Sequence, residues 1–216
     1  MTKISNDYYA NLLRMLEDKY VAADRNGDLA GGSGSGGGLV RWERKRRVIA
    51  AAFDRGGTWL DVGCANGLLM ETVTAWTAQK GTHLEPYGLE LSPRIAERAR
   101  IRVARWADRI WCGNVMVWKP PMRFDYVTLL PEYAPPELRA TMIERVLRFF
   151  LNDGGRLIVC CYRPGSAPGA HTGDGPSAPA LLRELGFTSD GAAEVRDDDG
   201  TRWTSVAWID RKQPGL

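Results

Sequence analysis

The sequence predicts an α/β protein whose central sheet is mostly parallel and is covered by helices on both faces. From about residue 58 to residue 162, short apolar segments alternate with segments of helical period, an order typical of strand–helix–strand units. Near the C-terminus, two apolar segments are joined by the turn Asp197-Asp198-Asp199-Gly200, which predicts an antiparallel hairpin at one edge of the sheet. A chain of 216 residues suits one such domain with a short extension.

Composition and charge are those of an ordinary soluble globular protein. Hydrophobic residues make up 44% of the chain and charged residues 25%, and the net charge of +3 does not by itself call for a nucleic-acid partner. The four cysteines lack the spacing of metal ligands, which predicts free thiols and no metal site. Because no apolar leader or bilayer-spanning segment is present, we expect a cytoplasmic protein without a membrane partner.

The first 40 residues are expected to form a helical extension. Apolar residues recur at helical spacing from about Asn6 to Tyr20. The run from Gly31 to Gly38 has almost no side chain to bury, so we expect a flexible surface loop. A flap that closes over a ligand is the functional alternative, and such a run is also typical of an engineered linker. We therefore divide the chain into an extension or lid, residues 1–40, and a main domain, residues 41–216.

A second helix is expected from about Leu39 to Phe53. Its first turns are crowded with basic side chains, which we interpret as a solvated helix face rather than a phosphate-binding patch. These basic residues are Arg41, Arg44, Lys45, Arg46 and Arg47.

Turn and cap residues set the bounds of the remaining elements. Ser92 suits a helix cap, Pro93 the first helical position and Gly81 a helix end. We expect Asn152-Asp153-Gly154-Gly155 to end the preceding helix and the fifth strand to follow from Arg156. The predicted strands are 58–62, 86–91, 110–114, 124–130, 156–162, 187–195 and 201–209, and the predicted helices are 67–79, 92–105, 136–151 and one that ends at 185.

The strongest functional signal is the segment LDVGCANG, residues 60–67, between the first strand and the following helix. Gly63 and Gly67 allow a tight turn and a close backbone approach to a ligand. The free N–H groups at the start of the helix attract an anion. Asp61, at the end of the strand, offers an acceptor to an ammonium group. A glycine turn of this kind can also be a plain strand-to-helix connection.

A second acidic residue, Glu90, ends the second strand 23 residues beyond Gly67. At this position a carboxylate can accept hydrogen bonds from both hydroxyls of a ribose. A carboxylate buried at a strand end is costly unless a ligand or a partner satisfies it, and an ion pair with Arg94 is the alternative. Ala65 stands where the dinucleotide-binding pattern has its central glycine, which argues against a nicotinamide cofactor.

These segments resemble the class I S-adenosylmethionine-dependent methyltransferases over about residues 40–210. Besides residues 60–67, the resemblance rests on GLELS (88–92), Gly113-Asn114-Val115, FDYV (124–127) and NDGGRLIV (152–159). It implies a doubly wound, Rossmann-like sheet, S-adenosylmethionine as cofactor and S-adenosylhomocysteine as product. The cofactor-binding residues that it implies are Asp61, Gly63, Cys64, Ala65, Asn66, Gly67, Glu90, Leu91, Asn114, Val115, Leu129 and Leu130.

The resemblance also implies a role for each part of this set. The 63–67 turn would wrap the methionine moiety with Asp61 near its amino group, and Glu90 would hold the ribose. Leu91 would cover the adenine, whose edge would be read by Asn114 and the backbone of Val115, while Leu129 and Leu130 would flank the sulfonium. Asn114 replaces the acidic residue common in the family, but its amide oxygen can still accept a hydrogen bond.

The methyl acceptor is less well marked. Leu129-Leu130-Pro131-Glu132 stands where many amide- and nucleobase-amino methyltransferases carry Asn/Asp-Pro-Pro-aromatic, which disfavours those substrates. Candidates for contact with the acceptor lie after the fourth strand, in Pro131-Glu132-Tyr133. Among them Glu132 is the candidate catalytic base or cation anchor, with a solvated loop carboxylate as the alternative. We expect His171 to be an exposed residue of the 162–179 loop rather than a base. Tyr8 and Tyr9 either dock the first helix, which we favour, or form part of a lid, and Trp111 and Trp118 are expected to pack in the core.

Three functions fit these observations. A methyltransferase that acts on a small molecule is favoured. An RNA methyltransferase would use the basic residues of 41–47 and of the 94–109 helix, with an affinity that falls steeply with salt. A module that binds S-adenosylmethionine without turnover is the third.

Overall fold

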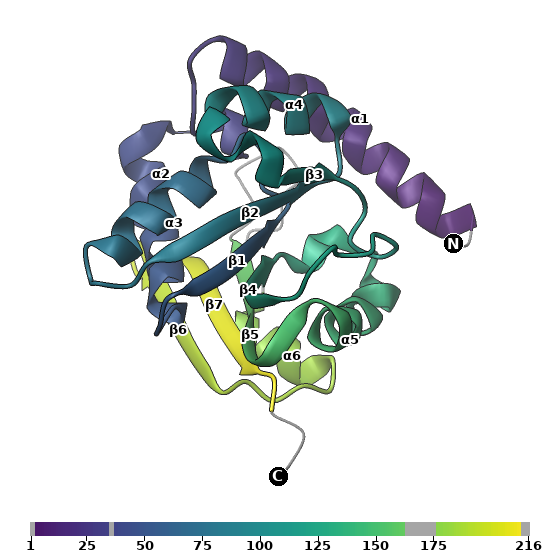
Figure 1. The fold of residues 1–216 in the computed structure, drawn as a ribbon, viewed down its shortest axis with the longest axis vertical. Helices are drawn as coiled ribbons and strands as arrows, with labels where there is room; N and C mark the ends of the chain where they lie inside the picture. Colours follow the sequence, from purple (N-terminus) through teal and green to yellow (C-terminus); the bar gives the residue numbers. More distant parts are fainter. Residues whose placement is uncertain (1–2, 35–36, 163–175, 213–216) are drawn as a thin grey trace.

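A seven-stranded sheet in the order β3-β2-β1-β4-β5-β7-β6 forms the centre of the computed structural model, which describes residues 3–34, 37–162 and 176–212 (Figure 1). Neighbouring strands from β3 to β5 run parallel, whereas β7 is antiparallel to both β5 and β6. The predicted doubly wound α/β fold with a C-terminal antiparallel hairpin is confirmed. The strands are β1 (Gly57–Val62), β2 (Leu84–Glu90), β3 (Ile110–Cys112), β4 (Phe124–Leu129), β5 (Leu151–Tyr162), β6 (Gly191–Arg196) and β7 (Arg202–Asp210).

Helices cover both faces of the sheet because successive residues of a strand point to opposite sides. On β1, Trp59 packs in the hydrophobic core cluster beneath α2, η2 and α3. The next residue, Leu60, packs in a second hydrophobic core cluster, beneath α5 and α6. The α-helices are α1 (Lys3–Arg25), α2 (Gly38–Arg46), α3 (Leu68–Ala78), α4 (Pro93–Arg102), α5 (Arg139–Phe149) and α6 (Ala178–Glu184). The 3₁₀ turns are η1 (Gly31–Ser33), η2 (Arg47–Ala52), η3 (Ala104–Arg109), η4 (Pro131–Tyr133) and η5 (Pro136–Leu138).

The N-terminal helix lies across the carboxyl edge of the sheet beside α4 (Figure 1). It is longer than the predicted 6–20 segment, and acidic residues on its α4 side form ion pairs there. Arg94 on α4 lies 2.7 Å from Asp18, and Arg98 lies 2.6 Å from Asp24.

Helix α1 also packs on Ala65, just after β1, through Val21, and its Glu17 accepts a hydrogen bond from Ser92, just after β2. It therefore lies over the carboxyl ends of these two strands. Parallel sheets of this topology bind ligands at that edge.

The expectation of a flexible surface loop for the glycine-rich run is wrong for its first residues. Gly31 and Gly32 are buried and form a 3₁₀ turn with Ser33. A Cβ added to Gly32 would lie 2.8 Å from Asn66 Nδ2, so the bare backbone is what allows this close packing. Residues 35–36 of the run lie outside the described residues.

The predicted helix does end before residue 152, since α5 ends at Phe149, but the expectation that residues 152–155 precede the fifth strand is wrong. These residues belong to β5, and the pairing with β4 shifts register between Phe124 and Tyr126. Gly154 adopts a φ of +73° and Asn152 donates a hydrogen bond to Asp125 at 3.0 Å. The turn-forming residues therefore make an irregularity inside a strand rather than a loop between two elements.

No helix among the described residues combines the length and apolar character needed to cross a bilayer, and no group of three His, Cys, Asp or Glu side chains in this part of the chain is placed to hold a metal ion. The division at residue 40 into an extension and a main domain stays a prediction.

Candidate functional site

A cavity lies between α1 and the carboxyl ends of β1, β2 and β3. Six of the predicted cofactor residues line it, namely Gly63, Ala65, Glu90, Leu91, Asn114 and Val115. One wall was not predicted from the sequence. The inner side of α1 supplies it, through Tyr9, Leu12, Leu13, Leu16, Glu17 and Tyr20.

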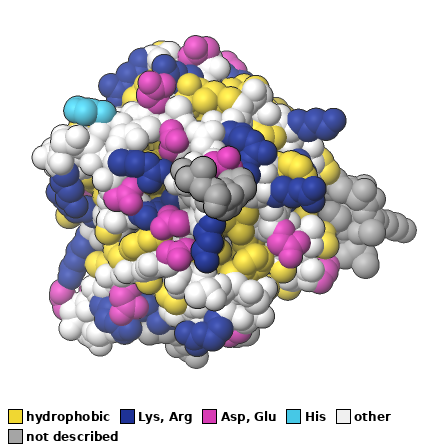
Figure 2. Space-filling model, turned by 60° about the horizontal axis from the view of Figure 1, so that its bottom comes forward, with side chains coloured by type: hydrophobic (Ala, Val, Ile, Leu, Met, Phe, Trp, Pro, Cys, Tyr) yellow, Lys and Arg dark blue, Asp and Glu magenta, His cyan; other side chains and the backbone are white. Residues whose placement is uncertain are grey.

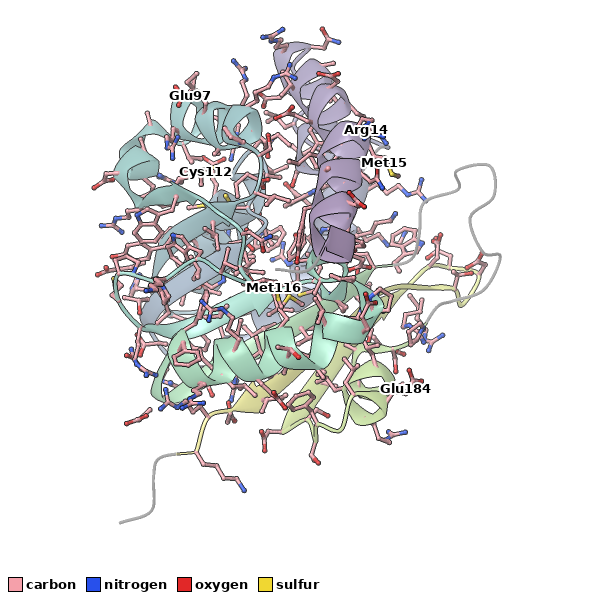
Figure 3. All side chains as sticks on the ribbon, turned by 90° about the vertical axis from the view of Figure 1, so that its right-hand side faces the viewer. Arg14, Met15, Glu97, Cys112, Met116 and Glu184 are labelled. Carbon is pink, nitrogen blue, oxygen red and sulfur yellow. The ribbon has the colours of Figure 1, made fainter. Side chains whose placement is uncertain are left out.

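The orientation of α1 explains why these side chains reach the cavity. Arg14 and Met15 lie on the outer side of the helix (Figure 3), and Met15 is 72% exposed. Residues three and four positions apart share a helix face, so Leu12, Leu13 and Leu16 turn inward. They remain only partly buried. An apolar ligand surface in the cavity would remove this remaining leucine surface from water and so favour binding.

The turn after β1 has an unusual backbone. Gly63, Ala65 and Gly67 adopt φ values of +73°, +48° and +76°. Ala65 is the one non-glycine residue with positive φ in the described part of the chain. Such left-handed conformations are costly for residues with a Cβ and cluster at ligand sites. The Ala65 N–H donates to Glu90 Oε2 at 3.0 Å, so this turn is tied to the end of β2.

Glu90 is 8% exposed and lines the cavity. Its carboxylate accepts hydrogen bonds from the backbone N–H groups of Ala65 and Ser92, both at 3.0 Å. Burial raises the pKa of Glu90, while these backbone bonds lower it. The alternative partner Arg94 is engaged with Glu17 and Asp18 instead. A buried carboxylate that has no ion pair with a described residue is costly, and its remaining lone pairs are available to a ligand.

Asp61 is buried at the end of β1 and accepts a hydrogen bond from Thr128 Oγ1 at 2.8 Å. Burial raises the pKa of Asp61 to about 7, with a smaller contribution from the negative charge of Glu90. The hydrogen bond from Thr128 and the positive charge of Arg46 act in the opposite direction. Asp61 is not among the residues that line the cavity. The two carboxylates were expected to share one cavity. Only Glu90 lines it, whereas Asp61 is buried outside the lining.

Tyr133, on η4, occupies the space beside Gly63. Its hydroxyl donates to the Gly63 carbonyl at 3.4 Å, and a Cβ built on Gly63 would collide with that hydroxyl. Burial raises the pKa of Tyr133 far above its ordinary value, with further contributions from Asp61 and Glu90. The phenol is therefore neutral at physiological pH. The segment Pro131-Glu132-Tyr133 was predicted from the sequence to contact the acceptor, but a place for Tyr133 beside Gly63 was not predicted.

The interpretation of the basic run as a solvated helix face is wrong for Arg46. Arg41, Arg44 and Arg47 are exposed, whereas Arg46 is 7% exposed. Its guanidinium stacks on Tyr162 at 3.4 Å and forms no ion pair or hydrogen bond with a described residue. Arg46 lies on the same helix face as the fully buried Trp42, four residues earlier. This spacing is the sequence signal that could have separated Arg46 from its neighbours.

Several predicted cofactor residues do not line the cavity. Cys64 points into a small core with Met70 and Ala96, and Leu129 belongs to the main core. Asn66 has a structural partner, since its amide donates to the Leu29 carbonyl at 3.0 Å and so holds the segment that follows α1. Gly67 and Leu130 are also absent from the lining. Their assignment to cofactor binding stays a prediction.

The far end of the cavity is suited to a flat ring. Leu89, Leu91, Ile95 and Val115 give it apolar walls, and Asn114 supplies a polar group. Asn114 Oδ1 accepts the Met116 N–H at 2.9 Å, which fixes the orientation of the amide.

The predicted base lies at the rim. Glu132 is exposed on η4, and its backbone carbonyl accepts the Tyr8 hydroxyl at 2.6 Å. Surrounding protein atoms raise the pKa of Glu132, against the charge of Arg139. Tyr9 is buried and donates to the Tyr133 carbonyl at 3.2 Å. The two tyrosines thus dock α1 onto η4, as favoured, and Tyr9 also lines the cavity. His171 lies outside the described residues.

The aromatic residues expected in the core are partly buried and pack against it. Trp111 stacks on Tyr87, with ring centroids 5.6 Å apart, and Trp118 lies against Trp111. They hold the β2–β3 edge behind the ring end of the cavity.

Comparison with known proteins was made at the level of both sequence and structure. No protein-family model and no curated protein matches the chain. The N-methyltransferase NodS from Bradyrhizobium japonicum WM9 matches with a TM-score of 0.58 and 16% identity, over 78% of this chain and 93% of NodS. A 1,6-didemethyltoxoflavin-N1-methyltransferase of Burkholderia thailandensis, solved with its substrate and S-adenosylhomocysteine, matches with a TM-score of 0.58 and 19% identity, over 94% and 90%. The chain has the fold of the class I S-adenosylmethionine-dependent methyltransferases.

The methyltransferase fold is shared at low identity, so it establishes architecture and not reaction. The cyclase SpnF also matches, with a TM-score of 0.63 and 16% identity over 92% of this chain and 95% of SpnF. A protein with this fold is thus named for a cyclisation. The reaction of the present chain has to come from its own site.

Proposed function

We propose that the protein is an S-adenosylmethionine-dependent methyltransferase that acts on a small molecule. The observation that carries this proposal is Glu90, a buried carboxylate that has no ion pair with any described residue and lines a cavity at the end of β2. It supplies acceptors for two vicinal hydroxyls at the place where a ribose binds in sheets of this topology. The left-handed turn from Gly63 to Gly67 brings bare backbone to the same cavity.

The residues present fit the cofactor in each of its parts. Glu90 would hold the ribose, and the apolar end of the cavity with Asn114 would hold the adenine. The amino and carboxylate groups of the methionine moiety require an anion and a cation. Asp61 and Arg46 provide them, since both are buried, neither forms an ion pair with a described residue, and their charges act on each other.

The bound cofactor supplies an activated methyl group on a positively charged sulfur. The protein's own contribution is to align the acceptor with that group and to exclude water, which can be worth about 7–11 kcal/mol in favourable cases. Helix α1 closes one side of the site with leucines, and η4 borders it with Tyr133. Where the acceptor must lose a proton, Glu132 is the candidate base, because its raised pKa brings it closer to neutral pH.

Replacement of Arg46 by Gln should weaken the binding of S-adenosylhomocysteine while leaving adenosine binding unchanged. The variant loses a charge-assisted bond to the amino-acid carboxylate, and such bonds contribute about 1.5–3 kcal/mol, or roughly 10- to 150-fold in affinity. Calorimetric titration with both ligands measures the ratio. Arg47→Gln, an exposed neighbour, is the matched control. An equal loss for adenosine would show that Arg46 supports the fold rather than the carboxylate.

The reaction is tested by incubation of the protein with methyl-labelled S-adenosylmethionine and separated cellular fractions. The proposal predicts labelled product in the low-molecular-weight fraction, with release of S-adenosylhomocysteine. Binding of the cofactor without label transfer to any fraction would instead support a non-catalytic binding module.

Label in the RNA fraction would favour the RNA methyltransferase. The basic surfaces that were predicted to bind RNA are largely neutralised by ion pairs. Arg94 and Arg98 pair with acidic residues of α1, and Arg44 pairs with Asp198. On the face shown in Figure 2, basic and acidic side chains are interspersed. This distribution lacks the basic stripe typical of RNA-binding proteins.

A further inference from the structure

The cavity stops short of the two buried charges that the proposed function assigns to the methionine moiety. Its lining includes Gly63, Glu90 and the ring end of the site, but neither Asp61 nor Arg46. Tyr133 and Gly63 both line the cavity, and the Tyr133 hydroxyl contacts the Gly63 carbonyl. The two charged anchors are buried outside this lining.

The Tyr133 side chain occupies the space that Gly63, which has no side chain, would otherwise leave open to a ligand. Gly63 has a left-handed backbone, with φ of +73°, and no Cβ, yet the Tyr133 hydroxyl stands where a Cβ would project. A ligand that uses the bare surface of Gly63 must first displace this hydroxyl. The phenol is also close to the charges of Asp61 and Glu90, both of which act on its ionisation.

The hydroxyl itself is weakly held, whereas the ring packs against the main core. Its hydrogen bond to the Gly63 carbonyl is 3.4 Å long, near the upper limit for such a bond. The backbone around the residue is fixed more firmly, because the Tyr8 and Tyr9 hydroxyls bind the carbonyls of Glu132 and Tyr133 at 2.6 and 3.2 Å. A side chain with a loosely bound tip on a restrained backbone can turn aside while η4 and α1 stay in place.

We propose that Tyr133 is a specificity-determining gate between the nucleoside part of the cavity and the anchors Asp61 and Arg46. The gate admits adenosine without movement and must swing away from Gly63 for a ligand that carries the amino-acid chain. The energy for this opening comes from the pairing of the ligand's ammonium and carboxylate with the two enclosed charges. The inference rests on the proposed function, since it concerns entry of the same cofactor.

The test compares adenosine and S-adenosylhomocysteine on the wild-type protein and on Tyr133→Ala, Tyr133→Leu and Tyr133→Phe. If the gate is open in only a fraction of molecules, the apparent affinity for S-adenosylhomocysteine is reduced by that fraction. Removal of the ring in the Ala and Leu variants should raise this affinity by at least about fivefold relative to the affinity for adenosine. The Phe variant keeps the ring and should bind S-adenosylhomocysteine less tightly than the Ala and Leu variants do.

The kinetic form of the test uses stopped-flow tryptophan fluorescence. Wild-type protein should bind S-adenosylhomocysteine with a slow opening phase that adenosine lacks and that disappears in Tyr133→Leu. A lower affinity for S-adenosylhomocysteine in folded Ala and Leu variants, or an unchanged ratio of the two ligands, would overturn the gate. Failure of the wild-type protein to bind either ligand would instead refute the proposed function, and the gate with it.

Discussion

Replacement of Glu90 by Gln should reduce the affinity for S-adenosylmethionine by about 100-fold, the loss expected when two hydrogen bonds to a charged acceptor are weakened. The carboxylate offers acceptors on both oxygens, and each oxygen already receives one backbone N–H, from Ala65 or from Ser92. An amide in its place presents a donor to one of these N–H groups. It also offers one acceptor fewer to the ribose.

The matched control for this prediction is Glu97→Gln on α4. The Glu97 side chain is 62% exposed, and its pairing with Arg100 at 3.5 Å is a surface contact of small worth. Figure 3 shows this residue at the outer side of the helix. Calorimetry on both variants, with thermal unfolding to verify the fold, gives the comparison. Wild-type affinity in folded Glu90→Gln would mean that the ribose lies elsewhere.

Replacement of Asp61 by Asn should stabilise the ligand-free protein at pH 8 while weakening S-adenosylmethionine binding. The pKa of Asp61 is raised from 3.8 to about 7, so above pH 7 the fold carries an ionised carboxylate that is buried without a charged partner in contact. At about 1.4 kcal/mol per pKa unit, this costs on the order of 4 kcal/mol as an upper limit. Asparagine keeps an acceptor for the Thr128 hydroxyl and removes the charge. Exchange of stability for binding at one residue is typical of functional sites.

The sign of the pH dependence follows from the raised pKa. The folded protein holds a proton on Asp61 that the unfolded chain releases, so the stabilising advantage of Asn is fully present above about pH 7 and vanishes toward pH 4. Asp54 and Asp125, whose pKa values are lowered, act in the opposite direction. They are common to both proteins, so the difference between wild type and variant isolates Asp61.

Ligand binding should show the complementary trend. An ammonium group favours the ionised carboxylate, so wild-type affinity for S-adenosylmethionine should fall about tenfold per pH unit well below pH 7. The Asn variant should bind weakly without this dependence. Unfolding curves and titrations at pH 5, 6, 7 and 8 measure both effects. Parallel stability profiles for the two proteins would contradict the assignment of a raised pKa to Asp61.

Local signals in the sequence were sufficient for the sheet and for half of the site. Gly63 and Glu90 were predictable because a left-handed turn requires glycine and because strand ends of a parallel sheet share one edge. The predicted start of the fifth strand at residue 156 was too late because turn residues also serve irregularities within strands. In β5, pairing with β4 outweighed their preference for a loop.

The other half of the site depends on tertiary packing. Leu12, Leu13 and Leu16 have the spacing of any amphipathic helix, and their role is set by the surface on which α1 docks. Arg46 is one of five basic residues in this run, and it differs from the other four only in lying on the buried face of α2. Tyr133 belongs to the segment after the fourth strand that was predicted to contact the acceptor, but its place over Gly63 comes from the fold of η4.

The central claim is that the cavity beside Glu90 binds the nucleoside of S-adenosylmethionine. Calorimetric titration of the wild-type protein with S-adenosylhomocysteine, with NAD as the comparison ligand, tests it most directly. We predict one site per chain with a dissociation constant of about 1–100 μM for S-adenosylhomocysteine, which corresponds to roughly 5.5–8 kcal/mol, and no measurable heat from NAD. Saturable binding of NAD in the absence of S-adenosylhomocysteine binding would contradict the account.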